Sequence, residues 1–140
     1  NSTKEALKDL SAQWINFFKK PIIAITGSNG KTTTKEMIRS ILDSINKTNY
    51  TIGNYNSTIG LPMNLFNFSL SSNPMVLEMG ANSPGEIDYL CKIAKPDYSI
   101  ITNIQSAHIG NFKSIKDLIE TKISIFKNTN NKGFILIPSD

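Results

Sequence analysis

A glycine-rich loop followed by a lysine and two threonines carries the clearest chemistry in this sequence. It runs from Gly27 to Thr33 and follows a short β-branched apolar run, residues 22–25. Glycines let a backbone approach phosphate oxygens closely, and the N–H groups of such a loop and of a following helix face the anion. Lys31 would add a charge at the β- and γ-phosphates, and the Thr32 hydroxyl suits Mg²⁺. The pattern predicts a triphosphate site formed by Gly27, Ser28, Asn29, Gly30, Lys31, Thr32 and Thr33.

The loop departs from the usual form of this motif, G-x-x-x-x-G-K-[ST], because Ile25 stands where the first glycine is expected. A chance glycine turn before a helix is the alternative interpretation. The strand pattern before the loop and the helical pattern after it favour the phosphate site.

Two further side chains are candidates for the same site. Glu78 is a carboxylate inside the apolar run of residues 75–79, where an unpaired charge is costly and needs a cation or hydrogen-bond donors. It is interpreted as a ligand of Mg²⁺, with a structural ion pair to a lysine as the alternative. His108, the single histidine, is either a surface or capping residue or a ligand of metal or substrate.

Lys122 interrupts an apolar helix face. The helix expected over residues 114–127 places Ile115, Leu118, Ile119 and Phe126 on one face, and Lys122 lies within that face. A snorkelling lysine is one interpretation. The other is a partly desolvated amine of lowered pKa that points to the active-site edge. Glu86 is also charged, but a capping box with Ser83 explains it, and it receives no catalytic role.

The elements that must position these residues alternate between strands and helices. This alternation predicts a parallel sheet with helices on both faces, a P-loop NTPase-like α/β fold built as an αβα sandwich. Ligands of such sheets bind at the carboxyl ends of the strands, so the glycine loop, Glu78 and His108 should meet at one edge. Strands are expected over residues 22–26, 49–52, 75–79, 98–102 and 133–137, and helices over 2–19, from 31 onward, 61–68, from 83 onward and 114–127.

Apolar stripes predict how two of these helices pack. The first helix should bury Leu7, Leu10, Trp14, Phe17 and Phe18, and the helix after Lys31 should bury Met37, Ile38, Ile41, Leu42 and Ile45.

The composition indicates one ordinary globular domain of 140 residues, with 39% hydrophobic residues. Cys91 is the single cysteine, so there is no disulfide framework and a reducing compartment is expected. The net charge is +4, but lysines supply 14 of the 15 basic residues and are scattered, so no nucleic-acid partner is expected. No apolar run approaches the ~20 residues of a membrane helix. We therefore expect a cytoplasmic protein without membrane insertion, as a monomer.

Several segments together resemble the Mur ligases of peptidoglycan synthesis, in that family's order and spacing. They are TGSNGKTTTKEM, YNSTIGLPMNL, LEMGANSPGEI, ITNIQSAHIGNF and KISIF. The resemblance implies ATP-dependent amide-bond formation: ATP phosphorylates a carboxylate to an acyl phosphate, and an amine then attacks it. LEMGAN-x-x-GEI and N-x-x-IG-x-P point to the branch that adds D-alanyl-D-alanine to a UDP-N-acetylmuramoyl tripeptide. The alternatives are another Mur-type ligase, a folylpolyglutamate synthase relative, a nucleotide-binding module without ligation, and an inert folding unit.

The resemblance also implies roles for individual residues. Lys31 would stabilise the transferring phosphoryl group, and Thr32 with Glu78 would hold one Mg²⁺. His108 would bind a second metal ion, supported by Lys122 after carbamylation. Catalytic roles therefore fall on Lys31, Glu78, His108 and Lys122, while Asn56 and Thr58 lie in a loop that resembles a substrate-contacting one.

The family has three domains, so the resemblance also predicts a domain assignment. Residues 1–20 are expected to be the entry helix or linker from an N-terminal domain, and residues 21–140 the first part of the central ATP-binding domain. We expect this chain to be a fragment that does not ligate by itself.

Overall fold

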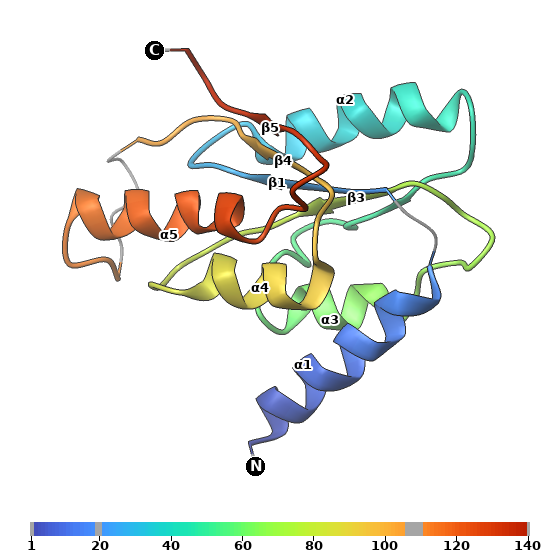
Figure 1. The fold of residues 1–140 in the computed structure, drawn as a ribbon, viewed down its shortest axis with the longest axis horizontal. Helices are drawn as coiled ribbons and strands as arrows, with labels where there is room; N and C mark the ends of the chain where they lie inside the picture. Colours follow the sequence, from blue (N-terminus) through green and yellow to red (C-terminus); the bar gives the residue numbers. More distant parts are fainter. Residues whose placement is uncertain (1, 19–20, 106–110, 140) are drawn as a thin grey trace.

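A five-stranded parallel sheet forms the centre of the molecule in the computed structural model, which describes residues 2–18, 21–105 and 111–139 (Figure 1). The strand order is β2-β3-β1-β4-β5, so the first long strand lies in the middle. The strands are β1 (Ile22–Thr26), β2 (Asn49–Tyr50), β3 (Met75–Glu78), β4 (Tyr98–Ile101) and β5 (Ile135–Leu136). The parallel sheet and all five strand positions were predicted, with ends that differ by a few residues.

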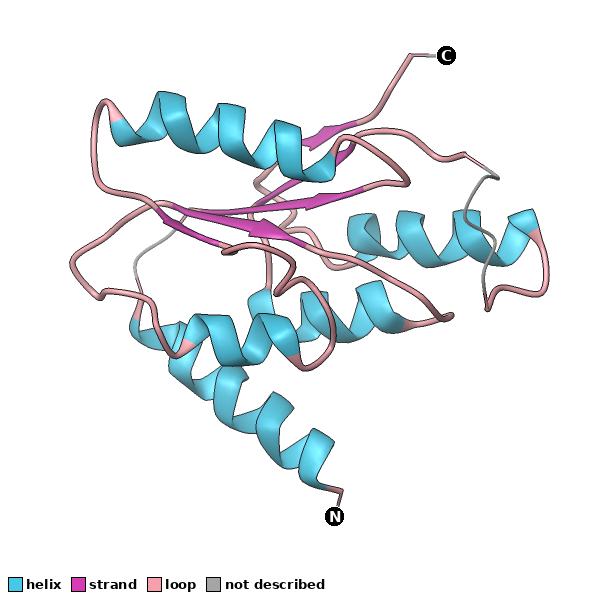
Figure 2. Cartoon of the chain, turned by 180° about the vertical axis from the view of Figure 1, so that it is seen from behind, coloured by secondary structure: helices cyan, strands magenta, loops and turns pink. Residues whose placement is uncertain are grey.

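Helices cover both faces of this sheet, which confirms the predicted αβα sandwich. In Figures 1 and 2, α2 (Lys31–Asp43) lies on one face and the other helices lie on the opposite face. Those helices are α1 (Thr3–Trp14) with the short 3₁₀ turn η1 (Ile15–Phe17), α3 (Gly60–Leu65), α4 (Glu86–Ala94) and α5 (Ile115–Lys127). Within the described residues no helix is both long and apolar enough to cross a bilayer.

The central strands are buried because they are flanked on both sides by other strands and on both faces by helices. β1 pairs in parallel with β3 (Ile25 opposite Glu78) and with β4 (Thr26 opposite Ile101). This register brings the ends of β1, β3 and β4 to one edge. At the opposite edge, Asp97 Oδ2 accepts a hydrogen bond of 2.9 Å from Ile22 N. The sheet therefore presents Thr26, Glu78 and Ile101 side by side where a ligand is expected.

The predicted buried face of the first helix is partly wrong. Ser2 caps α1, since its Oγ accepts from Glu5 N at 3.4 Å. Leu10 is 61% exposed and Phe17 is 72% exposed, although both were expected to be buried. Phe18 is buried as predicted, and Ser11 and Ile15 are buried where Leu10 and Phe17 were expected. Ser11 can be buried because its hydroxyl donates to the Leu7 carbonyl at 2.7 Å, which satisfies it inside the helix.

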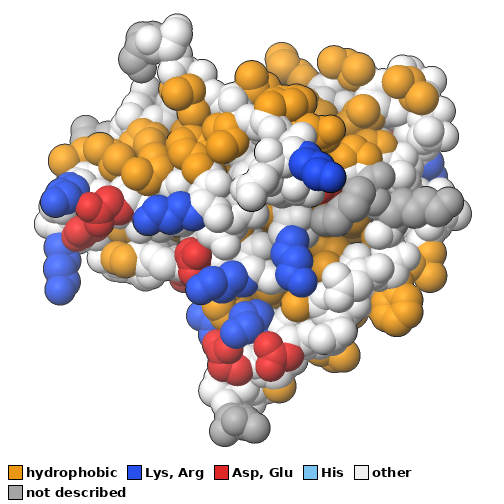
Figure 3. All heavy atoms as spheres, in the orientation of Figure 1, with side chains coloured by type: hydrophobic (Ala, Val, Ile, Leu, Met, Phe, Trp, Pro, Cys, Tyr) orange, Lys and Arg blue, Asp and Glu red, His pale blue; other side chains and the backbone are white. Residues whose placement is uncertain are grey.

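The predicted buried face of α2 is also wrong in part. Met37, Ile41 and Ile45 are 63%, 66% and 75% exposed, and the helix residue buried deepest is Lys35. The helix is rotated so that Lys35, near its start, faces the sheet, and Met37, Ile41 and Ile45 consequently face the solvent. Apolar side chains consequently gather over α2 and β5 in the upper part of Figure 3, where Phe134, Ile135, Leu136 and Ile137 are exposed as well.

Two other local expectations change. α5 buries Leu118, Thr121, Lys122 and Ile125, whereas Ile115 and Ile119 are 41% and 38% exposed. α4 begins at Glu86 rather than near residue 83, and its N-cap is Gly85, with a φ of 83°, rather than Ser83. Glu86 still caps backbone, since its Oε2 accepts from Asn82 N at 2.7 Å and Ser83 N at 3.2 Å. This contact supports leaving Glu86 out of the catalytic residues.

Candidate nucleotide-binding site

The glycine loop joins β1 directly to α2. Gly27 has a φ of 151° and Gly30 a φ of 76°. Residues that carry a side chain rarely adopt these backbone conformations. Gly30 is the N-cap of α2, and no side chain of the described residues caps that helix. The N–H groups of its first turn are therefore available to an anion, together with the positive end of the helix dipole.

The segment that follows β4 fixes this loop from outside. Ser28 N donates to Asn103 O at 3.0 Å, and Asn29 N donates to Asn103 Oδ1 at 2.9 Å. Gln105 N donates to Ser28 Oγ at 2.9 Å, and Asn29 Nδ2 donates to Gln105 Oε1 at 2.7 Å. These four hydrogen bonds fasten the loop to the segment after β4.

A close approach explains the glycine at position 27. A Cβ there would lie 1.9 Å from Thr102 Oγ1, a distance that no side chain tolerates. Thr102 Oγ1 in turn donates to Asn29 O at 2.6 Å. The end of β4 is thus packed against the loop, and a larger residue at position 27 would push the two apart.

Two lysines converge on the Gly27 carbonyl. Lys31 Nζ donates to Gly27 O at 2.9 Å and to Ser28 O at 3.1 Å, and Lys122 Nζ donates to Gly27 O at 2.9 Å. Burial lowers the pKa of Lys31, and the nearby Glu78 partly opposes this. Burial, with a smaller contribution from the Lys31 charge, lowers the pKa of Lys122 from 10.5 to about 8. Lys122 is 4% exposed, so its amine faces the loop rather than snorkelling to solvent.

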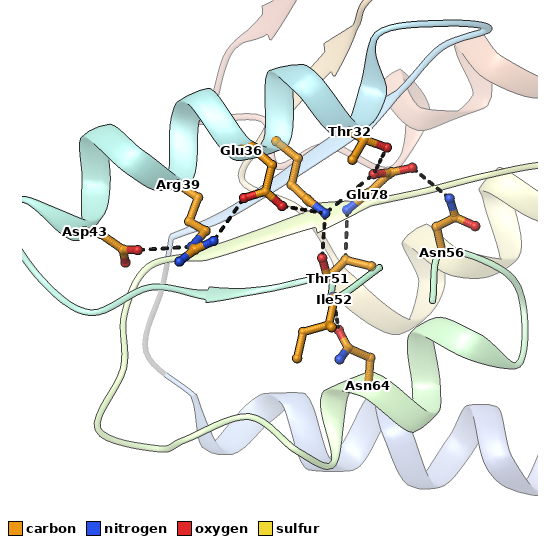
Figure 4. A network of polar contacts seen from close by, with 10 residues as sticks. Thr32, Glu36, Arg39, Asp43, Thr51, Ile52, Asn56, Asn64 and Glu78 are labelled. Carbon is orange, nitrogen blue, oxygen red and sulfur yellow. Dashed lines mark hydrogen bonds and ion pairs between the residues drawn. The ribbon is translucent and has the colours of Figure 1, made fainter. Parts of the chain in front are cut away.

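Glu78 lies between the first turn of α2 and the loop after β2, and its side chain is 3% exposed (Figure 4). Its Oε2 accepts from the Thr32 hydroxyl at 2.9 Å, and its Oε1 accepts from Asn56 Nδ2 at 2.7 Å. Lys35 Nζ lies 3.9 Å from Oε2. The ion pair with a lysine that the sequence left open is therefore present, alongside a direct contact with Thr32.

The glycine loop, both lysines that contact it and Asn56 line one cavity of about 620 Å³ at the carboxyl edge of the sheet. Its lining includes Gly27, Lys31, Asn56, Phe112, Leu118 and Lys122. Two lysine amines, the N–H groups at the start of α2 and the Glu78 carboxylate held by Asn56 are suited to a polyphosphate accompanied by a divalent cation.

The remaining predicted residues are distributed as follows. Ser28, Asn29 and Gly30 form the loop described above, and Thr33 is exposed on α2. Asn56 contacts Glu78, whereas Thr58 is 8% exposed and is not among the described residues lining the cavity. His108 lies outside the described residues. Within residues 2–18, 21–105 and 111–139, no three His, Cys, Asp or Glu side chains cluster as a ready-made metal site.

Sequence reasoning missed the residues that hold the site together. Lys35 and Thr51 contact the Glu78 region, and Asn103 and Gln105 hold the loop. The polar pair that directly follows β4, Thr102 and Asn103, was an available indication, because polar residues at the carboxyl end of a central parallel strand lie beside the ligand edge.

The fold and this loop define the class: an α/β domain of the P-loop type, with its ligand edge at the carboxyl ends of β1, β3 and β4. Residues 25–140 match the Mur ligase middle domain. The chain belongs to the Mur ligase family, as its motifs indicated.

Similar proteins agree with this assignment. The UDP-N-acetylmuramoyl-tripeptide--D-alanyl-D-alanine ligases of Bacillus subtilis and Escherichia coli are 36% and 33% identical over 140 and 138 residues, covering 100% and 99% of this chain. MurF from Acinetobacter baumannii superimposes with a TM-score of 0.94 at 38% identity over 99% of the chain, and MurF from Thermotoga maritima in complex with ADP with 0.93 at 35% identity over all of it. The chain spans 30% to 33% of the length of these four proteins.

Proposed function

We propose that this chain is the ATP-handling part of a ligase that adds D-alanyl-D-alanine to a UDP-N-acetylmuramoyl tripeptide. The names of its relatives give the substrates, and the ADP complex of the Thermotoga maritima protein supports ATP as the energy source. The proposal places the enzyme in the cytoplasm as a monomer, in the synthesis of peptidoglycan and thus in cell shape and division. Residues 1–20 are proposed to link it to an N-terminal domain.

One observation carries the proposal: the Thr32 hydroxyl donates to the Glu78 carboxylate at 2.9 Å, and Asn56, which holds the other oxygen of this carboxylate, lines the same cavity as Lys31 and Lys122. Both Thr32 and Glu78 offer oxygen atoms, the ligands that Mg²⁺ prefers. They therefore fit one Mg²⁺, which when bound would neutralise phosphate charge. His108 and a carbamylated Lys122 are proposed for a second Mg²⁺.

The residues of this chain would act chiefly by binding and orienting the reactants. The loop and the start of α2 hold the phosphates, and Lys31 leaves the Gly27 carbonyl to contact the phosphoryl group in transfer. The tripeptide carboxylate attacks the γ-phosphorus, ADP leaves, and an acyl phosphate forms. The amine of D-alanyl-D-alanine then attacks the acyl carbon, and the collapse of the tetrahedral intermediate releases phosphate. Asn56 and Thr58 are proposed to border the substrate.

Lys122 has the chemistry to become a carbamate. Its lowered pKa, about 8, leaves part of the amine neutral near pH 7, and the neutral amine adds CO₂ with loss of one proton. The product is a carboxylate that attracts a metal ion which the ammonium would repel.

The test is substrate-dependent release of ADP and phosphate by a full-length ligase that carries this chain. We expect release only when ATP, the UDP-muramoyl tripeptide and D-alanyl-D-alanine are all present, and its loss in Glu78→Gln. Lys116→Ala, an exposed lysine on α5, is the control and should retain activity. Nucleotide binding without ligation would favour the binding-module alternative, and acceptance of another amino acid or of a folate in place of these substrates would favour another ligase of the group.

A further inference from the structure

Lys35 is buried inside the protein, although it belongs to a helix with an exposed outer face. Its side chain is 1% exposed, and the mechanism above does not use it. Burying a lysine charge is costly unless the ammonium is paired and hydrogen-bonded. The partners of Lys35 therefore indicate what its burial achieves.

The ammonium of Lys35 joins three elements. It donates to the Thr51 carbonyl at 2.8 Å, at the end of β2, and lies 3.1 Å from Glu36 Oε1 on its own helix. It also lies 3.9 Å from Glu78 Oε2 on β3. Figure 4 labels these three partners, Thr51, Glu36 and Glu78, within one network of polar contacts.

The same elements carry both proposed Mg²⁺ ligands. Thr51 Oγ1 accepts from Glu78 N at 3.0 Å, so the residue that binds Lys35 also fixes the backbone of Glu78. Thr32 lies three residues before Lys35 on α2 and donates to Glu78 Oε2 at 2.9 Å. Lys35 thus fastens the turn of α2 that carries Thr32 to the strand ends that carry Glu78.

We propose that Lys35 is a positioning residue that holds the Thr32 hydroxyl and the Glu78 carboxylate at the separation needed to bind Mg²⁺ with ATP. The inference rests on the proposed function, because it takes these two residues as the ligands. Asn56 holds the other oxygen of Glu78, so Lys35 and Asn56 together restrict the carboxylate from both ends. A purely structural lysine would affect stability but not the dependence of ATP binding on Mg²⁺.

The experiment compares ATP affinity with Mg²⁺ and with EDTA, by calorimetry on the full-length ligase. The variants are Lys35→Met, Glu78→Gln and the double variant, with circular dichroism and thermal unfolding as checks on the fold. Arg39→Met is the matched control, because Arg39 lies one turn further along α2 and contacts the same Glu36, at 3.0 Å. Its other contacts among the described residues are with Asp43 and the Tyr50 ring, away from Glu78. If Lys35→Met does not fold, Lys35→Gln, which keeps a donor for Thr51 but removes the charge, takes its place.

We expect Lys35→Met to reduce the gain in affinity from Mg²⁺ about tenfold, the size of one lost charge-assisted contact, with little change in EDTA. Arg39→Met should keep the full gain. In the Glu78→Gln background, Lys35→Met should add no further loss, because it acts through Glu78.

Three results would overturn the inference: a folded Lys35→Met protein with the normal Mg²⁺ gain, a larger gain than normal, or a further loss in the Glu78→Gln background. A full Mg²⁺ gain in Glu78→Gln alone would instead overturn the proposed metal ligands. The two failures are therefore distinguishable.

Discussion

Replacing Lys122 by methionine should change how the stability of this chain depends on pH. Methionine fills a similar volume without a charge. In the folded chain the pKa of Lys122 is lowered from 10.5 to about 8 by burial and by the Lys31 charge. Between these two values the unfolded chain binds a proton at Lys122 that the folded chain does not bind. The free energy of unfolding therefore rises with pH across that window.

The magnitude follows from the two pKa values. Each pKa unit corresponds to about 1.4 kcal/mol, so lowering the pKa from 10.5 to about 8 costs ~3 kcal/mol of stability below pH 8. The cost is nearly absent at pH 10.5. Because Lys122 is 4% exposed, solvent screens this effect little. The stability of the natural chain relative to Lys122→Met should thus improve by ~3 kcal/mol between pH 7 and pH 10.5.

The assay is urea unfolding of the 140-residue chain, followed by circular dichroism at several pH values in CO₂-free buffer. Lys116→Met, which replaces a lysine whose side chain is 81% exposed on the same helix, controls for losing one amine and should follow the natural chain at every pH. Parallel stability curves for Lys122→Met and the natural chain would refute the reasoning. The amine would then stay fully charged near neutral pH, and the carbamate proposal would lose its chemical basis.

Three further predictions concern the loop and the ligation reaction. Lys31→Ala in the full-length ligase should lower turnover by about 10²-fold or more, because a contact to the transferring phosphoryl group is lost. Unchanged turnover in a phosphate-release assay would contradict the assignment of the loop as a phosphate site. Gly27→Ala should lower the melting temperature and abolish ATP binding, because its Cβ would lie 1.9 Å from Thr102 Oγ1. Gly53→Ala, at a position with a φ of 54° and open space around it, should retain ATP binding. Equal effects of the two changes would rule out the steric explanation. The isolated chain should form no amide product, since the proposed ligation would depend on positioning of the substrates by further domains. Stoichiometric product from pure substrates in a mass-spectrometric assay would show otherwise.

The fold could be predicted largely because its strands carry local information. β1, β3 and β4 are short apolar runs bounded by proline, glycine or polar residues, as expected for strands buried in a parallel sheet. The buried faces of the helices were harder to predict, because an apolar stripe alone does not determine how the helix is rotated about its axis against the sheet. α2 carries apolar residues on two faces, and it is Lys35 that faces inward while Met37 and Ile41 are exposed.

The residues of the site, too, could be predicted only where the local sequence defines them. The glycine loop and Lys31 could be predicted because neighbouring residues in sequence form them, and Lys122 was noticed as a charge in an apolar face. Asn103 could not be assigned, because its bonds to Ser28 and Asn29 join segments more than 70 residues apart in sequence. The contact of the Asn56 amide with Glu78 could not be predicted either, because it is created only when the loop after β2 packs against the end of β3.

The hydrogen bonds from Asn103 and Gln105 to the glycine loop have a consequence for the kinetics of nucleotide binding. The conformational entropy of the loop is lost when the chain folds, not when ATP arrives, so the loop is preorganised and binding need not wait for it to close. Association should then be governed by diffusion and charge attraction, and differences in affinity should appear in the dissociation rate. The coupling is also reciprocal: a bound phosphate that steadies the loop steadies the segment after β4 by the same free energy.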